Sequence, residues 1–260
     1  MSSLEEQQAA CTENWIGAIE SLAKIVPNGR IVRLRGATLI KTGLRSPEFN
    51  IAFITAKVSD KSRLVNELER VFMEEGLLWQ IITSEEAVDG ATGAIKKFGL
   101  SFKETVPGMV MDYIPNEIPN RPKGLSIKKV KSEEDMISFF ETAENSFGGV
   151  LFDEKSYSSD ISLMTQNLQH FDGEFYLGFA DGKPVATSLL FRTGKTAGVY
   201  FVGTVPSHRR LGFGESMTWE AILDGKAAGC EMACLQATEM GKPLYQRMGF
   251  RTVIDYQLWR

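Results

Sequence analysis

The sequence predicts an α/β (α+β) fold with a mixed, mostly antiparallel sheet flanked by helices. Segments with apolar residues about 3.6 positions apart alternate with short β-branched segments along the chain. Three consecutive strand candidates, 174–180, 183–192 and 198–205, are joined by short turns rich in glycine, which are typical of hairpins. Between the two halves, PNEIPNRPKG at 115–124 contains three prolines and interrupts regular hydrogen bonding. We therefore expect two domains, 1–118 and 119–260.

Each element of the first half follows from its apolar spacing. Leu64, Leu68, Val71 and Phe72 recur at helical spacing, and Gly76 provides a stop. The stretch FNIAFITAKV has the composition of a strand. The elements expected in order are a helix over 4–25, strand structure over 30–41, a strand over 49–58, a helix over 60–75, a strand over 77–83, a helix over 87–98 and a strand over 102–114.

The second half has a different order of elements. Ser132 followed by Glu134 and Asp135 predicts a capped helix start, because acidic groups favour the positive end of a helix. The elements expected in order are a strand over 125–130, helices over 132–145 and near 154–169, the three hairpin strands, a helix over 214–229, a strand over 232–237, a helix over 242–248 and a strand over 252–258.

Charge and hydropathy exclude several classes of protein. The chain has 260 residues, with 29 Lys and Arg against 33 Asp and Glu, so it has no surplus of cations for a run of phosphates. We therefore expect no nucleic-acid partner. No segment has the ~20 apolar residues of a membrane span, and the N-terminus MSSLEEQQAA lacks the apolar core of a signal peptide. A cytoplasmic protein with no membrane partner is expected.

Cysteine and histidine are scarce. Cys11, Cys230 and Cys234 are an odd number for a disulfide framework, and we expect them to be reduced and mostly buried. With only His170 and His208 in the chain, no paired-histidine or CxxC metal motif exists, so no metal is expected. Neither histidine has a matching GxSxG elbow, which argues against a Ser-His-Asp triad.

One segment carries a chemical signal. TVPSHRRLGFG, residues 204–214, lies between the strand 198–205 and the helix that follows. A glycine-containing turn that opens a helix directs free N–H groups at one point, where the helix dipole favours an anion. A plain strand-to-helix turn, in which the glycines only permit tight geometry, is the alternative reading of this pattern.

Two motifs together resemble the GNAT superfamily of N-acetyltransferases. The first is Arg209-x-x-Gly212-x-Gly214 directly after a strand, and the second is Tyr245 separated by three residues from Gly249-Phe250. Both stand in the family's order, and so do the elements expected over 125–260. The resemblance implies the GNAT-like form of the mixed sheet in the second half.

The resemblance also implies a site for acetyl-coenzyme A (acetyl-CoA) as co-substrate. Main-chain groups at the end of the strand would contact the pantetheine arm, and amides of the turn would hold the pyrophosphate. Thr238 stands where many members place an asparagine. Tyr245 would be the catalytic acid, and filling the helix face is its alternative role. The implied coenzyme-binding residues are Val202, Gly203, Thr204, Arg209, Arg210, Leu211, Gly212, Phe213, Gly214, Glu215 and Thr238.

The implied reaction is direct transfer of an acetyl group to the amine of a small molecule, assisted by positioning of both substrates. The general base stays open among Glu174, Glu239, Asp153 and Glu154, whereas His208 is expected to lie too far from the acetyl group. Aromatic residues at 147, 152 and 157 either wall the acceptor pocket or pack the helices together. The acceptor, the acyl length and homodimer formation are left open.

The first half resembles a degenerate copy of the second. Its order over 49–114 repeats that over 198–258, and Lys96-Lys97-Phe98-Gly99-Leu100 matches Gln246 to Phe250. The turn at 54–65 contains no glycine for close approach of a phosphate, so this copy is expected not to bind the coenzyme. Trp79 either contributes to the acceptor cleft or packs in the core.

For the whole chain, a non-catalytic acyl-CoA-binding or sensing protein is the alternative to an enzyme.

Overall fold

The computed structural model describes residues 2–26, 28–73, 76–116, 118–149, 162, 165–167 and 170–260. These residues form two compact units. The C-terminal unit holds residues 2–15, 109–149 and 172–253, and the N-terminal unit holds 16–108, 254–260 and the described residues from 162 to 171. The units are thus built from interleaved segments rather than from two consecutive halves, and the functional division at residue 118 stays a prediction.

The C-terminal unit contains the hairpin strands that the sequence predicts. In its sheet the order is β10-β9-β8-β7-β6, and neighbours are antiparallel except for the parallel pair β9 and β10. This confirms a mixed, mostly antiparallel sheet. The strands are β6 (Ser126–Lys129), β7 (Gly173–Ala180), β8 (Lys183–Thr193), β9 (Thr196–Thr204) and β10 (Met232–Gln236).

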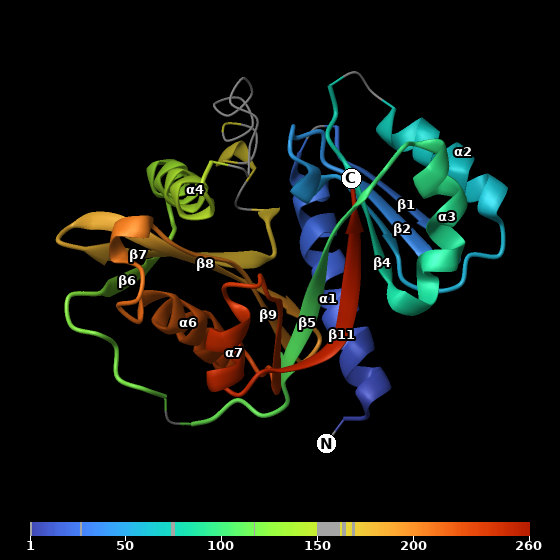
Figure 1. The fold of residues 1–260 in the computed structure, drawn as a ribbon. Helices are drawn as coiled ribbons and strands as arrows, with labels where there is room; N and C mark the ends of the chain where they lie inside the picture. The colour runs from blue at the N-terminus through green and yellow to red at the C-terminus, as the bar shows by residue number, and fades with distance from the viewer. Residues whose placement is uncertain are drawn as a thin grey trace. The chain divides into compact units, whose positions relative to one another are not determined.

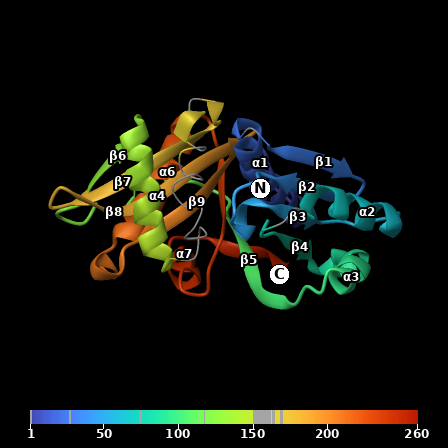
Figure 2. The same ribbon diagram turned by 90° about the horizontal axis from the view of Figure 1, so that it is seen from above.

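Helices cover both faces of this sheet. Figures 1 and 2 show α4 (Glu133–Phe147) on one face, and α6 (Phe213–Ala227) with α7 (Lys242–Arg247) on the other. The predicted cap of α4 is present, because the Asp135 amide donates to Ser132 Oγ at 3.1 Å. The apolar core lies between the sheet and α6, where Met217, Trp219 and Ile222 pack on Leu190 and Val199.

Polar contacts fix α6 on the sheet. Tyr176 of β7 donates to Asp224 of α6 at 2.7 Å, and the Lys129 ammonium lies 2.8 Å from the same carboxylate. Ser188 Oγ of β8 donates to the Met217 carbonyl at 2.9 Å. Because these contacts come from three strands, the direction of α6 and the place of its first turn are defined by the sheet.

In the N-terminal unit the strand order is β1-β2-β3-β4-β11. Here β3 and β4 are parallel and the other neighbours are antiparallel. Leucines and valines of α2 and alanines of α3 pack on one face of the sheet. The elements are β1 (Arg30–Leu34), β2 (Ala37–Lys41), β3 (Ile51–Ile54), α2 (Lys61–Phe72), β4 (Gln80–Ser84) and α3 (Val88–Lys97); α1 (Leu4–Ile25), β5 (Phe102–Met111) and β11 (Arg251–Trp259) belong partly to each unit.

The expected strand over 49–58 is wrong at both ends. Phe49 lies in a short 3-10 helix, Pro47–Phe49, and β3 ends at Ile54. The amides of Thr55 and Ala56 donate to the Gly36 carbonyl at 3.2 and 3.3 Å. Gly36, with φ of 84°, forms the turn of a hairpin, so the expected strand structure over 30–41 is the two strands β1 and β2. Contact with this turn bends the chain away from the sheet after β3.

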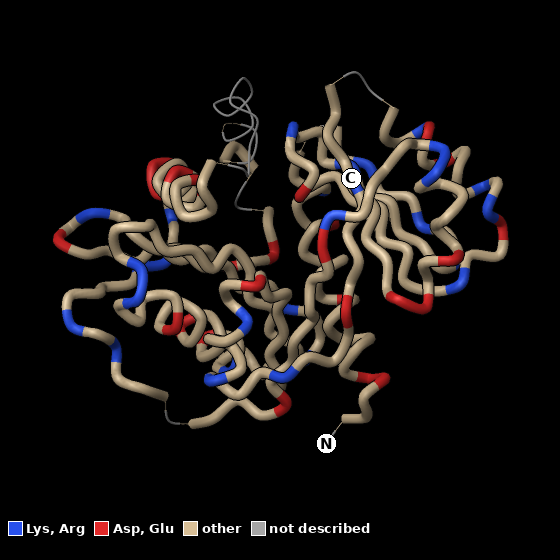
Figure 3. Tube along the Cα trace, in the orientation of Figure 1, with Lys and Arg blue, Asp and Glu red and all other residues tan. Residues whose placement is uncertain are grey.

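Charges of both signs alternate along the described chain (Figure 3). The acidic start of α4, Glu133–Asp135, lies at the helix end where the dipole favours negative charge. All three cysteines are free and buried, as the sequence predicts.

Candidate functional site

Strands β9 and β10 separate part of the way along their length. They pair in parallel through Thr196, Ala197 and Gly198 only. The pairing of β9 with β8 shifts register after Leu189, and Phe201 has a left-handed φ of 50°. Such a bulge bends a strand and strengthens its twist. The half of β9 beyond Gly198 therefore leaves β10 and opens a gap in the sheet.

The turn after β9 presents unpaired amides. Gly212 stands at the N-cap of α6 in the left-handed region, with φ of 80°. The first bond of the helix runs from the Ser216 amide to the Gly212 carbonyl at 3.1 Å. Phe213, Gly214 and Glu215 consequently have no intrahelical acceptor for their amides. Together with the positive end of the helix dipole, these amides form an anion-binding turn.

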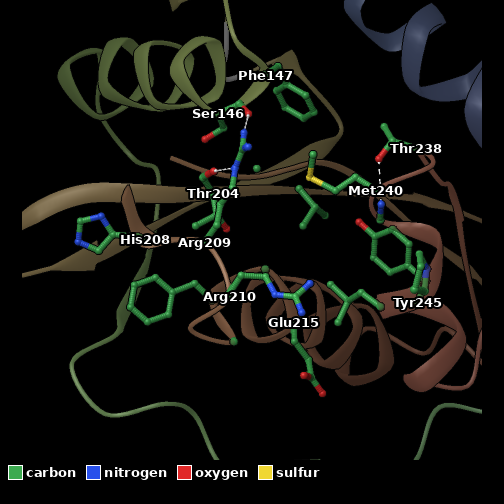
Figure 4. Close-up of a pocket in the computed structure, with 18 of the residues that line it drawn as sticks. Ser146, Phe147, Thr204, His208, Arg209, Arg210, Glu215, Thr238, Met240 and Tyr245 are labelled. Atoms are coloured by element: carbon green, nitrogen blue, oxygen red, sulfur yellow. Dashed lines mark hydrogen bonds between the residues drawn. The ribbon is translucent and has the colours of Figure 1, made fainter. Parts of the chain in front are cut away.

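The turn opens into a cavity of about 610 Å³, which is in the range of small-molecule sites. The structure brings eleven of the twelve predicted site residues to its walls (Figure 4). Leu211 is the exception, since it is not among the lining residues and is 53% exposed. The predicted residues at the cavity are Val202, Gly203, Thr204, Arg209, Arg210, Gly212, Phe213, Gly214, Glu215, Thr238 and Tyr245.

The lining is richer in cationic than in acidic side chains. Arg209, Arg210 and Arg247 line the cavity, against the single carboxylate of Glu215. Arg210 has a left-handed φ of 66°, an uncommon backbone state for a residue with a side chain. The cationic side chains and the positive end of the α6 dipole both attract negative charge, so the cavity suits a ligand with several negative charges.

Tyr245 of α7 presents a buried phenol to the cavity. The residue is only 7% exposed, and its hydroxyl points into the cavity in Figure 4. Burial raises the pKa of Tyr245 to about 12, while a hydrogen bond with Thr218 lowers it in part. Thr218 Oγ1 donates to the Gly214 carbonyl at 2.8 Å, so one hydroxyl links the phenol to the first turn of α6. At neutral pH the phenol keeps its proton and can donate it.

Several lining residues lie outside both motifs and outside the predicted coenzyme-binding set, and among them the sequence predicts only Phe147, as one of the aromatic residues that either wall the acceptor pocket or pack the helices together. Ser146, Phe147 and Gly148 come from the end of α4, and Met240 and Leu244 come from around the start of α7. Met240 and Leu244 lie just before the second motif along the chain, whereas the first three are distant from both motifs and only the packing of α4 on the sheet brings them to the cavity. Their types, a serine, a phenylalanine and a glycine, are common in helix ends anywhere.

Thr238 and His208 have local partners. Thr238 Oγ1 accepts from the Gly241 amide at 3.1 Å, in the turn that leads into α7. His208 Nδ1 lies 2.9 Å from Ser207 Oγ, and its ring stacks on Phe213 with centroids 6.1 Å apart. Both residues therefore shape the rim of the cavity.

The candidate bases do not converge on the cavity. Glu174 lies 3.8 Å from the Lys129 ammonium, and Glu239 is exposed and absent from the lining. Asp153 and Glu154 lie outside the described residues, as do Phe152 and Tyr157 of the expected acceptor segment. Trp79 stacks on Phe72 in the N-terminal unit, with centroids 4.8 Å apart, as in its core alternative.

The N-terminal unit has a different chemistry at the equivalent turn. Asp60 caps α2, with its carboxylate accepting from the Arg63 amide at 2.8 Å. A carboxylate thus occupies the helix start where a phosphate would bind, and it would repel one. Helices α3 and α7 end alike, because Leu100 donates to Ile95 and Phe250 donates to Tyr245 across Gly99 and Gly249. The Ile95 carbonyl thus accepts at the end of α3 as the Tyr245 carbonyl does at the end of α7, and the Ile95 side chain has no proton to donate.

Metal-ligand clusters and membrane-spanning helices are both absent from the described residues. Among them, no three His, Cys, Asp or Glu side chains gather as metal ligands would. No helix in the described part of the chain combines the length and the apolar content that a bilayer crossing requires.

Comparison with known proteins agrees with the geometry. A family model described as an acetyltransferase (GNAT) domain matches residues 123–240. The fold is similar to a GCN5-related N-acetyltransferase from Kribbella flavida, with TM-score 0.63 and 19% identity over 96% of this chain and 94% of that chain. It is also similar to a functionally unknown conserved protein from Staphylococcus epidermidis ATCC 12228, with TM-score 0.62 and 12% identity over 91% of this chain and 95% of that chain.

A third solved structure, a GCN5-related N-acetyltransferase from Sphaerobacter thermophilus, has TM-score 0.59 and 16% identity over 86% of this chain and 76% of that chain. Proteins of curated function include none whose sequence matches this chain. The structural likenesses, at such low identity, show the fold. The family match covers β9, the anion-binding turn and the end of α4. Residues 123–240 are therefore an acetyltransferase domain of the GNAT family.

Proposed function

We propose that the protein is an acetyl-CoA-dependent N-acetyltransferase that moves an acetyl group to the amine of a small molecule by direct transfer. One observation carries the proposal. The anion-binding turn at 212–215 and the neutral phenol of Tyr245 line the same cavity, at the point where β9 leaves β10. A thioester coenzyme with a phosphate end and a sulfur end needs these two groups in one cavity.

The residues at the cavity fit acetyl-CoA. Amides of Phe213, Gly214 and Glu215 would hold the pyrophosphate, and a Cβ at Gly214 would meet no atom closer than 3.7 Å, so a ligand can approach there. Val202 to Thr204 lie beyond the last β9–β10 pair, and main-chain groups on that edge of β9 are available to the pantetheine arm. The cationic lining favours the coenzyme's phosphates.

Direct transfer requires positioning and one proton donor. The coenzyme supplies an acyl carbon activated by sulfur. The acceptor nitrogen forms a bond to that carbon as the carbon–sulfur bond breaks, and the nitrogen loses one proton while the sulfur gains one. Tyr245 donates to the departing sulfur, and its pKa of about 12 keeps the phenol protonated at neutral pH and well above it. No covalent enzyme intermediate is needed.

The N-terminal part supports a related proposal, namely a degenerate GNAT-like copy that does not bind coenzyme. Asp60 at the start of α2 and Ile95 at the end of α3 are the observations in its favour. The same hydrogen bond across a left-handed glycine ends both α3 and α7. This likeness supports a common origin for the N-terminal and C-terminal parts of the chain.

A non-catalytic acyl-CoA-binding protein is the alternative, because Glu174 and Glu239 are absent from the cavity lining and the other two candidate bases, Asp153 and Glu154, lie outside the described residues. Release of thiol from acetyl-CoA, followed with a thiol-reactive dye across a panel of small amines, separates the two. Thiol release that depends on an amine supports the enzyme. Tight binding without release on any amine supports the binding protein.

Calorimetric titration with acetyl-CoA tests the site itself. Gly214→Ala should bind as the wild type does, because the added methyl group has ordinary space. Gly214→Glu places a carboxylate at the helix start and should weaken binding at least ~100-fold. This pair is sharper than a substitution at Gly212, whose φ of 80° strains any side chain. Equal affinity of a folded Gly214→Glu protein would refute the anion-binding turn.

A further inference from the structure

Arg209 opens the motif after β9, yet its side chain turns away from the start of α6. Its Nε donates to the Thr204 carbonyl at 3.2 Å, and one terminal nitrogen donates to the Ser146 carbonyl at 2.8 Å. Figure 4 shows both bonds, with the guanidinium reaching toward the end of α4. The guanidinium is therefore committed to two main-chain carbonyls.

The contact with Ser146 is favourable for two reasons. Ser146 lies in the last turn of α4, where carbonyls lack intrahelical donors, and Gly148 ends the helix in the left-handed region with φ of 79°. The dipole places negative charge at this helix end, which suits a cation. Arg209 thus satisfies a carbonyl of α4 and at the same time ties it to the end of β9.

A second observation shows how closely α4 and β9 approach there. A Cβ at Gly203 would lie 2.7 Å from Ser146 Cβ, closer than real Cβ atoms come. Ser146 is buried, and its Oγ donates to the Thr142 carbonyl at 2.7 Å. The end of α4 therefore rests directly on β9, and Ser146, Phe147 and Gly148 form one wall of the cavity.

We propose that Arg209 is a positioning residue of the coenzyme site: it fixes the last turn of α4 as a wall of the cavity and leaves the phosphates to the main-chain amides of α6. The part that concerns the coenzyme rests on the proposed function, whereas the brace between Arg209 and α4 does not. Since the wall faces β9 at Gly203, loss of the brace should disturb the pantetheine arm more than the phosphates.

Hydrogen exchange of the protein without ligand tests the brace. Arg209→Met removes both donors at similar volume, and the amides of Phe147, Gly148 and Gly149 should exchange about tenfold faster. Arg210→Met is the matched control, because no bond joins Arg210 to α4 in the described structure. Equal exchange of these amides in Arg209→Met and wild type would overturn the proposal.

Calorimetry with two probes tests the role in binding. Acetyl-CoA has the pantetheine arm, and ADP has a diphosphate without it. Arg209→Met and Arg209→Lys should both lower the affinity for acetyl-CoA about tenfold and the affinity for ADP less than about twofold. Lysine is expected to fail as methionine does, because it keeps the charge but cannot bond both carbonyls. Full rescue by lysine, or equal losses for both probes, would mean that the guanidinium binds phosphate and would overturn the proposal. A wild type that binds neither probe refutes the proposed function, and the exchange experiment still decides the brace.

Gly203→Ala perturbs the same wall without changing charge. Its methyl group must displace Ser146, so the amides at the end of α4 should exchange faster. The affinity for acetyl-CoA should fall more than the affinity for ADP. This variant carries the test if Arg209→Met does not fold. Wild-type affinity for acetyl-CoA in Gly203→Ala would contradict a role for the wall.

Discussion

Replacing Tyr245 by phenylalanine tests the proton on which the proposed chemistry depends. Burial raises the pKa of Tyr245 from 10.0 to about 12. Between these two values the folded protein keeps a proton that the unfolded chain releases. Stability therefore falls as the pH rises through this window, and it is unaffected by this group below about pH 10.

The size of the effect follows from the shift. A difference of about two pKa units corresponds to about 2.7 kcal/mol across the whole window, or about 1.4 kcal/mol between neutral pH and pH 11. Tyr245→Phe has no proton to lose there. At neutral pH the variant should be less stable by about 1 kcal/mol, because it loses the hydrogen bond with Thr218.

Urea unfolding of wild type and Tyr245→Phe from about pH 7 to about pH 11 measures this difference. We expect the stability of the wild type relative to the variant to fall by about 1.4 kcal/mol from about pH 7 to about pH 11, since only the wild type loses stability at this position. The variant, less stable by about 1 kcal/mol at neutral pH, should therefore become slightly the more stable protein at about pH 11. Tyr113→Phe, which removes a phenol that is 70% exposed, is the matched control. A stability difference between wild type and Tyr245→Phe that stays constant with pH would refute a buried, protonated phenol at the cavity. If the phenol is the acid, the same variant also lowers kcat by ~100-fold with little change in KM for acetyl-CoA.

Three further predictions concern the frame of the site and the N-terminal unit. Asn50→Ala should lower the free energy of unfolding by about 3 kcal/mol in thermal or urea melts, because this fully buried amide bonds main-chain groups of the loop after β2 and of Leu78. Burial raises the pKa of Asp224, but its bonds with Lys129 and Tyr176 outweigh this and lower it. Asp224→Asn should therefore be less stable than wild type at neutral pH, with a gap that shrinks as the pH falls below about 3.8. A constant gap would contradict this. Calorimetry should count one acetyl-CoA per chain, because the Asp60 carboxylate occupies the start of α2. Two sites would refute the contrast between the units.

The sequence by itself determined the order of the elements and the anion-binding turn. Helical and strand periodicity locate α1, α2, β7, β8 and β9 to within a few residues. Glycines at 212 and 214 signal the turn, because Gly212 adopts a left-handed φ that residues with a side chain rarely take and Gly214 leaves open space at the start of α6. Such signals are local, since each depends on residues adjacent along the chain.

Only the tertiary structure decided which side chains share the cavity and what each one does. The wall at Ser146–Gly148 comes from a helix more than fifty positions before the motif, and packing on β9 places it there. Arg209 is in the motif, but its bond to Ser146 shows that the side chain turns toward α4. Burial also raises the pKa of Tyr245 from 10.0 to about 12, and this shift depends on surroundings that α6 and the sheet provide. Contacts between distant segments and their exclusion of water form only when the chain has folded, so no local pattern in the sequence carries them.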